Sequence, residues 1–278
     1  MIEIITADNC GFCFGVRRAV DMLAGEIETG GKIYLFGEII HNDSFIKELK
    51  KKGVIVIDDD FKDFKDFGEL EENSSVVIRA HGIPKPAFEK LLEIKERKNI
   101  KIADATCECV KRMHAIAEEN TNANTLTLIF GDENHPEIAG LRSYVNGESV
   151  IYKNFDALKE DFGRIKQVFE KNHKKLIILV QTTHNINDYN KCKDHILGQN
   201  SGPGMTDTVF FDTICGATQK RQAEAGLLSE SSDIMIVVGG PNSSNTAKLY
   251  EICKKKLRKF FYCRNFRATA FKYIKRSR

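Results

Sequence analysis

Short apolar runs alternate along this chain with polar loops and with stretches in which apolar residues recur at helical spacing. Apolar runs that end in a polar loop predict buried strands, and spacings of three and four predict amphipathic helices. The predicted strands cover residues 2–6, 33–40, 54–57, 76–85 with its polar loop, 100–103, 126–130, 176–180, 209–211 and 234–240. The predicted helices cover residues 14–26, 44–52, 87–98, 108–119 and 216–228. Residues 153–175 and 184–207 are polar and lysine-rich, and we expect them to be connections.

Three cysteines occupy the same place in this pattern, directly after a predicted strand and at the start of a predicted helix. They are Cys13, Cys107 and Cys215, and each is followed within two turns by a pair of basic residues. A polar residue follows each cysteine 28 positions later, four residues beyond a glycine that ends an apolar run; these residues are His41, His135 and Ser243. Equal separations with matching chemistry predict an internal triplication in which each copy is a set of βα units.

The repeat predicts an α/β fold of three related domains around a pseudo-threefold axis. We expect domain 1 at residues 13–106, domain 2 at 107–207, and domain 3 at 208–278 together with 1–12. The second polar loop of the third copy would fall near 283–289, so we expect domain 3 to be incomplete at its C-terminal end. The last residues, 254–278, have no clear amphipathic period, and we interpret them as a frameshifted segment or as a natural basic tail.

Charge is distributed unevenly. The chain of 278 residues has a formal charge of +3, but residues 254–278 hold eleven Lys and Arg and no acidic residue, which leaves 31 basic and 39 acidic side chains elsewhere, a charge of −8. An acidic body argues against nucleic-acid binding. No apolar stretch is long enough to span a bilayer, so we expect no membrane association, and the first residues lack the pattern of a signal peptide. Eight cysteines without an export signal favour a cytoplasmic protein with metal or catalytic thiols over a disulfide framework.

The repeat brings the three cysteines to one centre, each at a helix N-terminus whose dipole favours the thiolate. Three converging thiolates indicate zinc or an iron–sulfur cluster. A 4Fe–4S cluster held by three cysteines would keep one iron open to a substrate oxygen. The pair Cys10-x-x-Cys13 also fits a redox dithiol, which would leave the other two copies unexplained. We interpret the remaining cysteines as structural or incidental: Cys10, Cys109, Cys192, Cys253 and Cys263.

The loops at the carboxyl ends of the predicted strands are rich in neutral hydrogen-bond donors, which suit an anion the size of a diphosphate or triphosphate. These side chains are His41, His81, His135, Gln181, Thr182, Thr183, Ser243, Ser244 and Asn245. Glu137 is the carboxylate among them, and a carboxylate in an anion site predicts a role in handling protons. Taken singly, each histidine also fits a surface or capping role; their common position at strand ends favours a site.

The same residues carry a resemblance to a known family. GFCFGVRRAV, GEIIHN, RAHGIP, DATC, NHPEIAG, QTT, DTIC and VVGGPNSSNT occur in this order and closely resemble the IspH/LytB family of 4-hydroxy-3-methylbut-2-enyl diphosphate reductases, over about residues 1–253. The resemblance implies a trefoil of three α/β domains around a 4Fe–4S cluster. It also implies the last step of the non-mevalonate isoprenoid pathway, in which two electrons and two protons remove the allylic hydroxyl to give isopentenyl and dimethylallyl diphosphates.

Residue roles follow from the matched motifs. The resemblance implies cluster ligands at Cys13, Cys107 and Cys215, and catalytic roles for Glu137, as proton relay, with His135 and Thr182. It further implies a ferredoxin or flavodoxin as electron donor. The implied substrate-binding residues are His41, His81, His135, Thr182, Ser243, Ser244 and Asn245.

The C-terminus departs from the family, which ends its last domain with a GASTP-like loop whose serine also binds the diphosphate. No such loop occurs here, so a second hypothesis is a catalytically impaired, cluster-binding remnant of the family. A third hypothesis is a zinc deaminase, suggested by His135-Pro136-Glu137. That signature also requires P-C-x-x-C, and the chain offers only Cys107-Glu108-Cys109.

Overall fold

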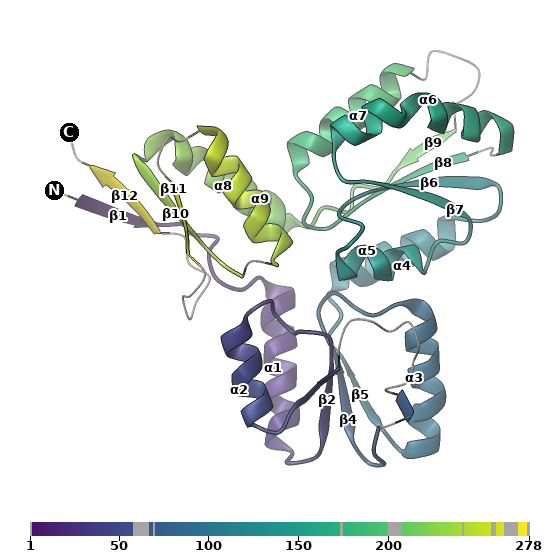
Figure 1. The fold of residues 1–278 in the computed structure, drawn as a ribbon, viewed down its shortest axis with the longest axis vertical. Coiled ribbons are helices and arrows are strands. Elements are labelled where there is room, and N and C mark those ends of the chain that lie inside the picture. The colour runs from purple at the N-terminus through teal and green to yellow at the C-terminus, as the bar shows by residue number, and fades with distance from the viewer. Residues whose placement is uncertain are drawn as a thin grey trace.

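Three α/β lobes surround a common centre in the computed structural model of this protein (Figure 1). The structure describes residues 2–57, 67–68, 70–172, 175–199, 207–240, 242–256, 260–263 and 272–276. Each lobe holds one four-stranded sheet with helices packed against it (Figure 1). The expected α/β class with three related units is therefore confirmed.

The first lobe is a parallel sheet in the order β3-β2-β4-β5, whose strands are β2 (Ile33–Phe36), β3 (Ile55–Ile57), β4 (Ser75–Ile78) and β5 (Lys101–Asp104). Its helices are α1 (Phe14–Glu28), α2 (Asp43–Lys51) and α3 (Lys85–Lys98). Leu35 and Phe36 are both fully buried but belong to separate core clusters. Adjacent strand residues point to opposite faces, so helices cover both faces of this sheet, as parallel sheets require.

The second lobe repeats this plan as a parallel sheet in the order β7-β6-β8-β9. Its strands are β6 (Thr125–Phe130), β7 (Glu148–Tyr152), β8 (Lys175–Val180) and β9 (Thr208–Phe210). Its helices are α4 (Glu108–Asn120), α5 (Pro136–Arg142), α6 (Phe155–Asn172) and α7 (Ile186–Gln199). Since β9 pairs with β8, the second sheet reaches a few residues beyond the predicted domain limit at 207; the limits themselves stay predictions.

The two polar connections of the second lobe are largely helical, and our expectation of simple connections was wrong. Helix α6 buries Leu158, Phe162, Ile165 and Phe169, which recur at helical spacing among its lysines and acids. Together with buried residues of α7 they cover one face of the sheet (Figure 1). Strand β7 and helix α5 were also not predicted as separate elements.

The third lobe joins both ends of the described chain in one sheet, in the order β1-β12-β10-β11. Its strands are β1 (Ile2–Thr6), β10 (Ile234–Val238), β11 (Phe260–Cys263) and β12 (Lys272–Arg276), and its helices are α8 (Gly216–Ser231) and α9 (Ser244–Lys256). Strand β12 runs antiparallel to both neighbours, with Ile274 opposite Ile4 and Ile234. Two strands thus lie in the basic segment for which no regular element was predicted.

The central strands end where the chain turns toward the middle of the molecule. Strand β2 ends at Phe36 rather than at residue 40, because Gly37 adopts a φ of +72° that strongly favours glycine. Strand β10 likewise ends at Val238. The polar loops that follow these strands are therefore free to line the space between the lobes. None of the described helices is both long and apolar enough to cross a membrane.

Candidate functional site

The three repeated cysteines lie around one central cavity of about 200 Å³. Cys13, Cys107 and Cys215 are the N-cap residues of α1, α4 and α8, as the sequence predicts. Each comes from the loop after the strand at one edge of its sheet, so every lobe contributes one thiol. All three are partly exposed, and none of the described cysteines forms a disulfide.

The backbone packs tightly beside the thiols. A Cβ atom on Gly15 would lie 2.6 Å from the Cys107 Sγ. The close approach of the α1 N-terminus to α4 therefore requires glycine at position 15. Burial, together with the charges of Cys13 and Cys215, raises the pKa of the Cys107 thiol. The expected thiolate is therefore not favoured at Cys107 by the protein alone. A metal cation shared by the three cysteines would offset this cost and favour the thiolate form of Cys107.

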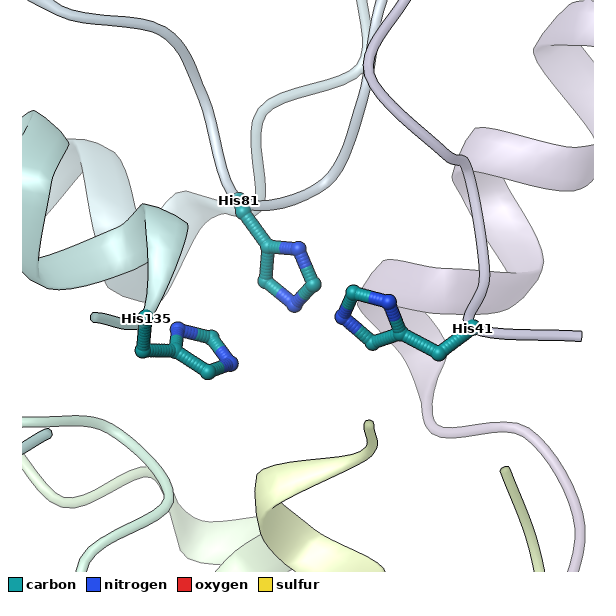
Figure 2. Close-up of side chains that lie close together, drawn as sticks. All are labelled: His41, His81 and His135. Atoms are coloured by element: carbon teal, nitrogen blue, oxygen red, sulfur yellow. The ribbon is translucent and has the colours of Figure 1, made fainter. Parts of the chain in front are cut away.

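Three imidazoles meet at another wall of the same cavity, as Figure 2 shows. His41 follows β2, His81 follows β4 and His135 precedes α5. One ring nitrogen from each lies within 4.8 Å of the others, and the His41 and His81 rings are stacked with centroids 5.4 Å apart. Such a group could hold a metal ion or contact an anion.

Burial and the neighbouring Arg79 lower the pKa of His81 well below its ordinary value, so this imidazole is neutral at physiological pH. The buried His41 Nε2 and His81 Nδ1 have no hydrogen-bond partner among the described residues. A buried nitrogen without a partner costs free energy, and a bound ligand would remove that cost. The trio therefore presents ring nitrogens, that of a neutral His81 among them, to a polar ligand.

Glu137 is fully buried in the wall of the cavity. Its side chain accepts hydrogen bonds from Thr182, in the loop after β8. The Thr182 backbone N–H donates to Glu137 Oε1 at 2.7 Å, and the Thr182 hydroxyl donates to Oε2 at 2.8 Å. Burial raises the pKa of this carboxyl group, which the two hydrogen bonds from Thr182 oppose. The Glu137 backbone N–H in turn donates to His135 Nδ1 at 3.2 Å. The carboxyl group is thus fixed in place and inclined to carry a proton.

The third lobe contributes the loop after β10 and the first turn of α9. Ser243, Ser244 and Asn245 all line the cavity, and Asn245 Oδ1 has no partner among the described residues. The Thr183 hydroxyl donates to the Ser244 hydroxyl at 2.8 Å, which joins the second lobe to the third. This loop also passes so close to the first lobe that a Cβ on Gly240 would lie 1.8 Å from the His41 carbonyl oxygen.

A larger cavity of about 780 Å³ adjoins the first and shares His41, His135, Ser243 and Ser244 with it. None of the three cysteines lines this larger cavity. It is wide enough to admit a small anionic ligand to the polar wall.

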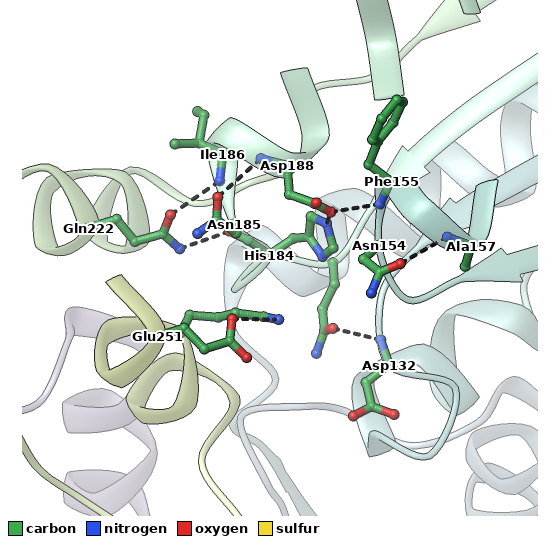
Figure 3. A network of polar contacts seen from close by, with 12 residues as sticks. Asp132, Asn154, Phe155, Ala157, His184, Asn185, Ile186, Asp188, Gln222 and Glu251 are labelled. Carbon is green, nitrogen blue, oxygen red and sulfur yellow. Dashed lines mark hydrogen bonds and ion pairs between the residues drawn. The ribbon is translucent and has the colours of Figure 1, made fainter. Parts of the chain in front are cut away.

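A polar network next to the larger cavity fixes the loop between β8 and α7 (Figure 3). Asp188 Oδ2 lies 3.2 Å from His184 Nε2 and accepts from the Phe155 backbone N–H at 3.1 Å. Gln222 of α8 donates to the His184 carbonyl at 2.9 Å and accepts from the Ile186 N–H at 3.2 Å. The sequence did not single out Gln222; its position two turns after Cys215 was the available signal.

The residues to which the matched motifs assign a role all line the 200 Å³ cavity: Cys13, Cys107, Cys215, His41, His81, His135, Glu137, Thr182, Ser243, Ser244 and Asn245. Their roles stay predictions. Gln181 lies instead in the larger cavity, where its Oε1 accepts from the Asp132 N–H at 3.1 Å. Cys109 also lines the smaller cavity and was not proposed for it.

Comparisons with known proteins agree on one family. A family model described as LytB protein matches residues 4–274. The chain is 34% identical over 276 residues to the 4-hydroxy-3-methylbut-2-enyl diphosphate reductase of Thermoanaerobacter sp. (strain X514), covering 99% of this chain and 88% of the relative.

Two solved structures have the same fold. One is described as the structure of (E)-4-hydroxy-3-methyl-but-2-enyl diphosphate reductase, the terminal enzyme of the non-mevalonate pathway. It aligns with a TM-score of 0.61 at 31% identity, covering 94% of this chain and 85% of that one. The other is the E-1-hydroxy-2-methyl-but-2-enyl-4-diphosphate reductase from Plasmodium falciparum. It aligns with a TM-score of 0.73 at 25% identity, covering 93% of this chain and 75% of that one. The family match over nearly the whole chain, on the fold and the cavity described above, shows that this chain belongs to the LytB protein family.

Proposed function

We propose that this protein is a 4-hydroxy-3-methylbut-2-enyl diphosphate reductase that produces isopentenyl and dimethylallyl diphosphates. The substrate takes up two electrons and two protons, its allylic C–O bond breaks, and the hydroxyl group leaves as water. The observation that carries this proposal is one cavity that combines three thiols, a buried carboxyl group whose pKa is raised by burial, and a wall of hydrogen-bonding side chains. The names of the relatives support the same activity.

The three thiols fit a 4Fe–4S cluster bound by Cys13, Cys107 and Cys215. They are unbridged, line the same cavity and come from three helix N-termini, whose dipoles stabilise anionic ligands. When bound, the cluster supplies single electrons and a Lewis-acidic iron. The electrons come from a one-electron carrier, for which we propose a ferredoxin or flavodoxin, in the cytoplasm.

The diphosphate binds to the wall of hydrogen-bonding side chains. His41 and His81 present ring nitrogens that lack partners among the described residues, and Asn245 presents its side-chain amide. The hydroxyls of Ser243 and Ser244 lie at the N-terminus of α9, where the helix dipole and free N–H groups favour a negative charge. Groups that are neutral avoid the cost of burying charges and still donate several hydrogen bonds to phosphate oxygens.

Glu137 delivers a proton to the substrate hydroxyl. A carboxyl group whose pKa is raised by burial holds its proton at a pH where an exposed glutamate would have lost it. Thr182 and His135 keep the group at the cavity wall through the hydrogen bonds described above. Protonation turns the hydroxyl into water, a far better leaving group.

The test begins with metal analysis of protein purified without oxygen. We expect about four irons and about four sulfides per chain, lost in Cys107→Ser. Cys109→Ser is the matched control, because Cys109 lines the same cavity two residues away and is expected to leave iron content unchanged. Zinc in place of iron would overturn the proposal, and so would protein with full iron content that releases no dimethylallyl or isopentenyl diphosphate when given substrate and reduced methyl viologen.

A further inference from the structure

In each basic pair that follows a cysteine, one side chain forms a hydrogen bond or an ion pair and the other is exposed. Arg18 donates to the Thr106 carbonyl at 2.6 Å, and Arg221 donates to the Gly11 carbonyl at 2.6 Å. Lys111 forms an ion pair with Asp104 at 2.8 Å. Arg18 joins the start of α1 to the loop before α4, and Arg221 joins α8 to the loop before α1. These bonded side chains thus hold the cysteine-bearing segments together.

The other member of each pair is exposed: Arg17, Arg112 and Lys220. None of them forms an ion pair or a side-chain hydrogen bond with a residue in the part of the chain that the structure describes. Each lies four or five residues after the N-cap cysteine of its helix, which places it roughly 6–8 Å along the helix axis. One unpaired cation therefore stands close to each thiol, once in every lobe.

Acidic groups do not cancel these charges. On the first two turns of α1, α4 and α8 there are six basic side chains, and the one acidic side chain is Glu108. Glu108 already faces Arg18 at 3.6 Å and Lys111 at 4.0 Å. These turns thus carry more positive than negative side chains on a body whose formal charge is −8 outside residues 254–278, even though Asp104 pairs with Lys111. We call the face formed by these turns the cysteine-helix face.

Two aromatic rings stand out on the same face. Phe14, next to Cys13, is 77% exposed, and Phe12, on its other side, is 36% exposed and also borders the cavity. A single exposed ring is ordinary, but aromatic anchors ringed by positive charge are typical of a protein–protein interface.

We propose that the cysteine-helix face is the docking surface for a small acidic electron-carrier protein, with Arg17, Arg112 and Lys220 steering it and Phe14 as its apolar anchor. This inference rests on the proposed function. Opposite charge raises the rate of encounter and orients the partner. Each docking event transfers one electron and leaves the carrier oxidised, so one turnover consumes two reduced carriers.

Docking here leaves the substrate route free. The larger cavity, which gives access to the polar wall, is lined by none of the cysteines and by none of the three cations. The thiols themselves are only partly buried, so a carrier on this face lies within a short distance of any cluster that they hold. Substrate and carrier can therefore be bound at the same time.

The test measures binding first, so that it does not depend on activity. Titration of the holoenzyme with an acidic ferredoxin is expected to show binding that weakens as salt is raised from about 0.01 M to about 1 M. The triple variant Arg17→Glu, Arg112→Glu, Lys220→Glu is expected to bind about tenfold or more weakly at low salt. The matched control, Lys159→Glu, Lys171→Glu, Lys191→Glu, reverses three exposed charges on α6 and α7 and is expected to bind like the parent.

Turnover with two reductants separates this proposal from the function itself. The charge-reversed variant is expected to keep its rate with reduced methyl viologen and to lose about tenfold or more with the ferredoxin. Equal ferredoxin affinity in the parent and the charge-reversed variant would overturn the docking proposal. So would tighter binding of an unstructured RNA oligonucleotide to this face, which would mark it as a nucleic-acid surface. Docking without any turnover would instead count against the reductase and leave the surface in place.

Discussion

The second and third lobes share a strand order but differ in the direction of one strand. In the second lobe, β8 runs parallel to β6, so that its carboxyl end brings Thr182 to Glu137. In the third lobe, β12 takes the equivalent place beside β10 but runs the other way, with Lys272 opposite Ile236. Among the described residues, the third lobe therefore lines the 200 Å³ cavity from one polar loop, where the second lobe uses two.

The comparison separates what the fold needs from what the site needs. A strand of either direction completes the sheet, because parallel and antiparallel pairing both satisfy the backbone groups. Only a parallel strand delivers a loop to the centre. The reversal of β12 thus preserves the lobe, while the polar wall of the cavity is formed by loops of the first and second lobes and by the loop after β10.

The largest predicted effect is the loss of turnover when the second lobe can no longer supply a proton. We expect Glu137→Gln to lower turnover by about 10²–10⁴-fold while the iron content stays at the parent value. Burial raises the Glu137 pKa, so the parent is expected to lose activity as pH rises through that raised pKa. The glutamine variant cannot lose a proton, and its residual rate is expected to lack this alkaline limb.

Glu133→Gln is the matched control for this prediction. Glu133 lies four residues earlier on the same loop, but its side chain is exposed and faces Arg142. Its rate and pH profile are expected to match the parent. A Glu137→Gln variant with normal turnover would show that the second lobe does not relay the proton.

The next prediction compares the cores of the two lobes. Leu128, in the central strand of the second lobe, belongs to a cluster of fifteen buried residues, whereas the third lobe's cluster holds six described residues, Leu249 among them. We expect Leu128→Ala to lower the free energy of unfolding by about 2–5 kcal/mol. We expect Leu249→Ala to lower the free energy of unfolding by a smaller amount. Backbone amides of β10 are expected to exchange hydrogen faster than those of β6 in the parent. Equal exchange in both strands would mean that the lobes unfold as one unit.

The smallest predicted effect concerns the link between the two lobes. Gln222→Ala leaves the His184 carbonyl and the Ile186 N–H without their partner. We expect a loss of about 1–3 kcal/mol in the free energy of unfolding, because both groups are in a buried or half-buried setting. Denaturant unfolding would measure it, with Gln219→Ala, on the same helix, as the milder control. A change no larger than that of the control would mean that the lobes are joined elsewhere.

The strands and helices that the sequence patterns predicted occur near the predicted positions, because both are local properties, but β7, β11, β12, α5, α6, α7 and α9 were not predicted. The N-cap position of each cysteine follows from strand, loop and helix signals within a few residues. Helix α6 was missed because its lysines and acids dominate the composition, although its buried positions at Leu158, Phe162 and Ile165 have helical spacing. The spacing of the apolar residues indicated a helix, but the polar composition of the whole segment concealed it.

The site was predictable as a set of residues but not as a set of contacts. The repeat indicated which loops meet, and the eleven residues to which the matched motifs assign a role line one cavity, whereas Gln181 does not line it. Nothing local could indicate that Thr182 donates twice to Glu137 or that Gln222 reaches across to His184, because these contacts depend on how three lobes pack. The direction of β12 was equally inaccessible, since pairing with β1 joins the two ends of the described chain.

That pairing has a consequence for how the protein is made. Ile2 pairs with Arg276, so the strand that leads to Cys13 is synthesised long before the strand with which it pairs (Figure 1). The first and second lobes, whose sheets use strands from 33–104 and 125–210, can fold while the rest of the chain is still being translated. Until then β1 presents an unpaired edge and its cysteine stands apart from the other two. Loading of any metal group that needs all three thiols must therefore wait until the strands of the third lobe have been synthesised.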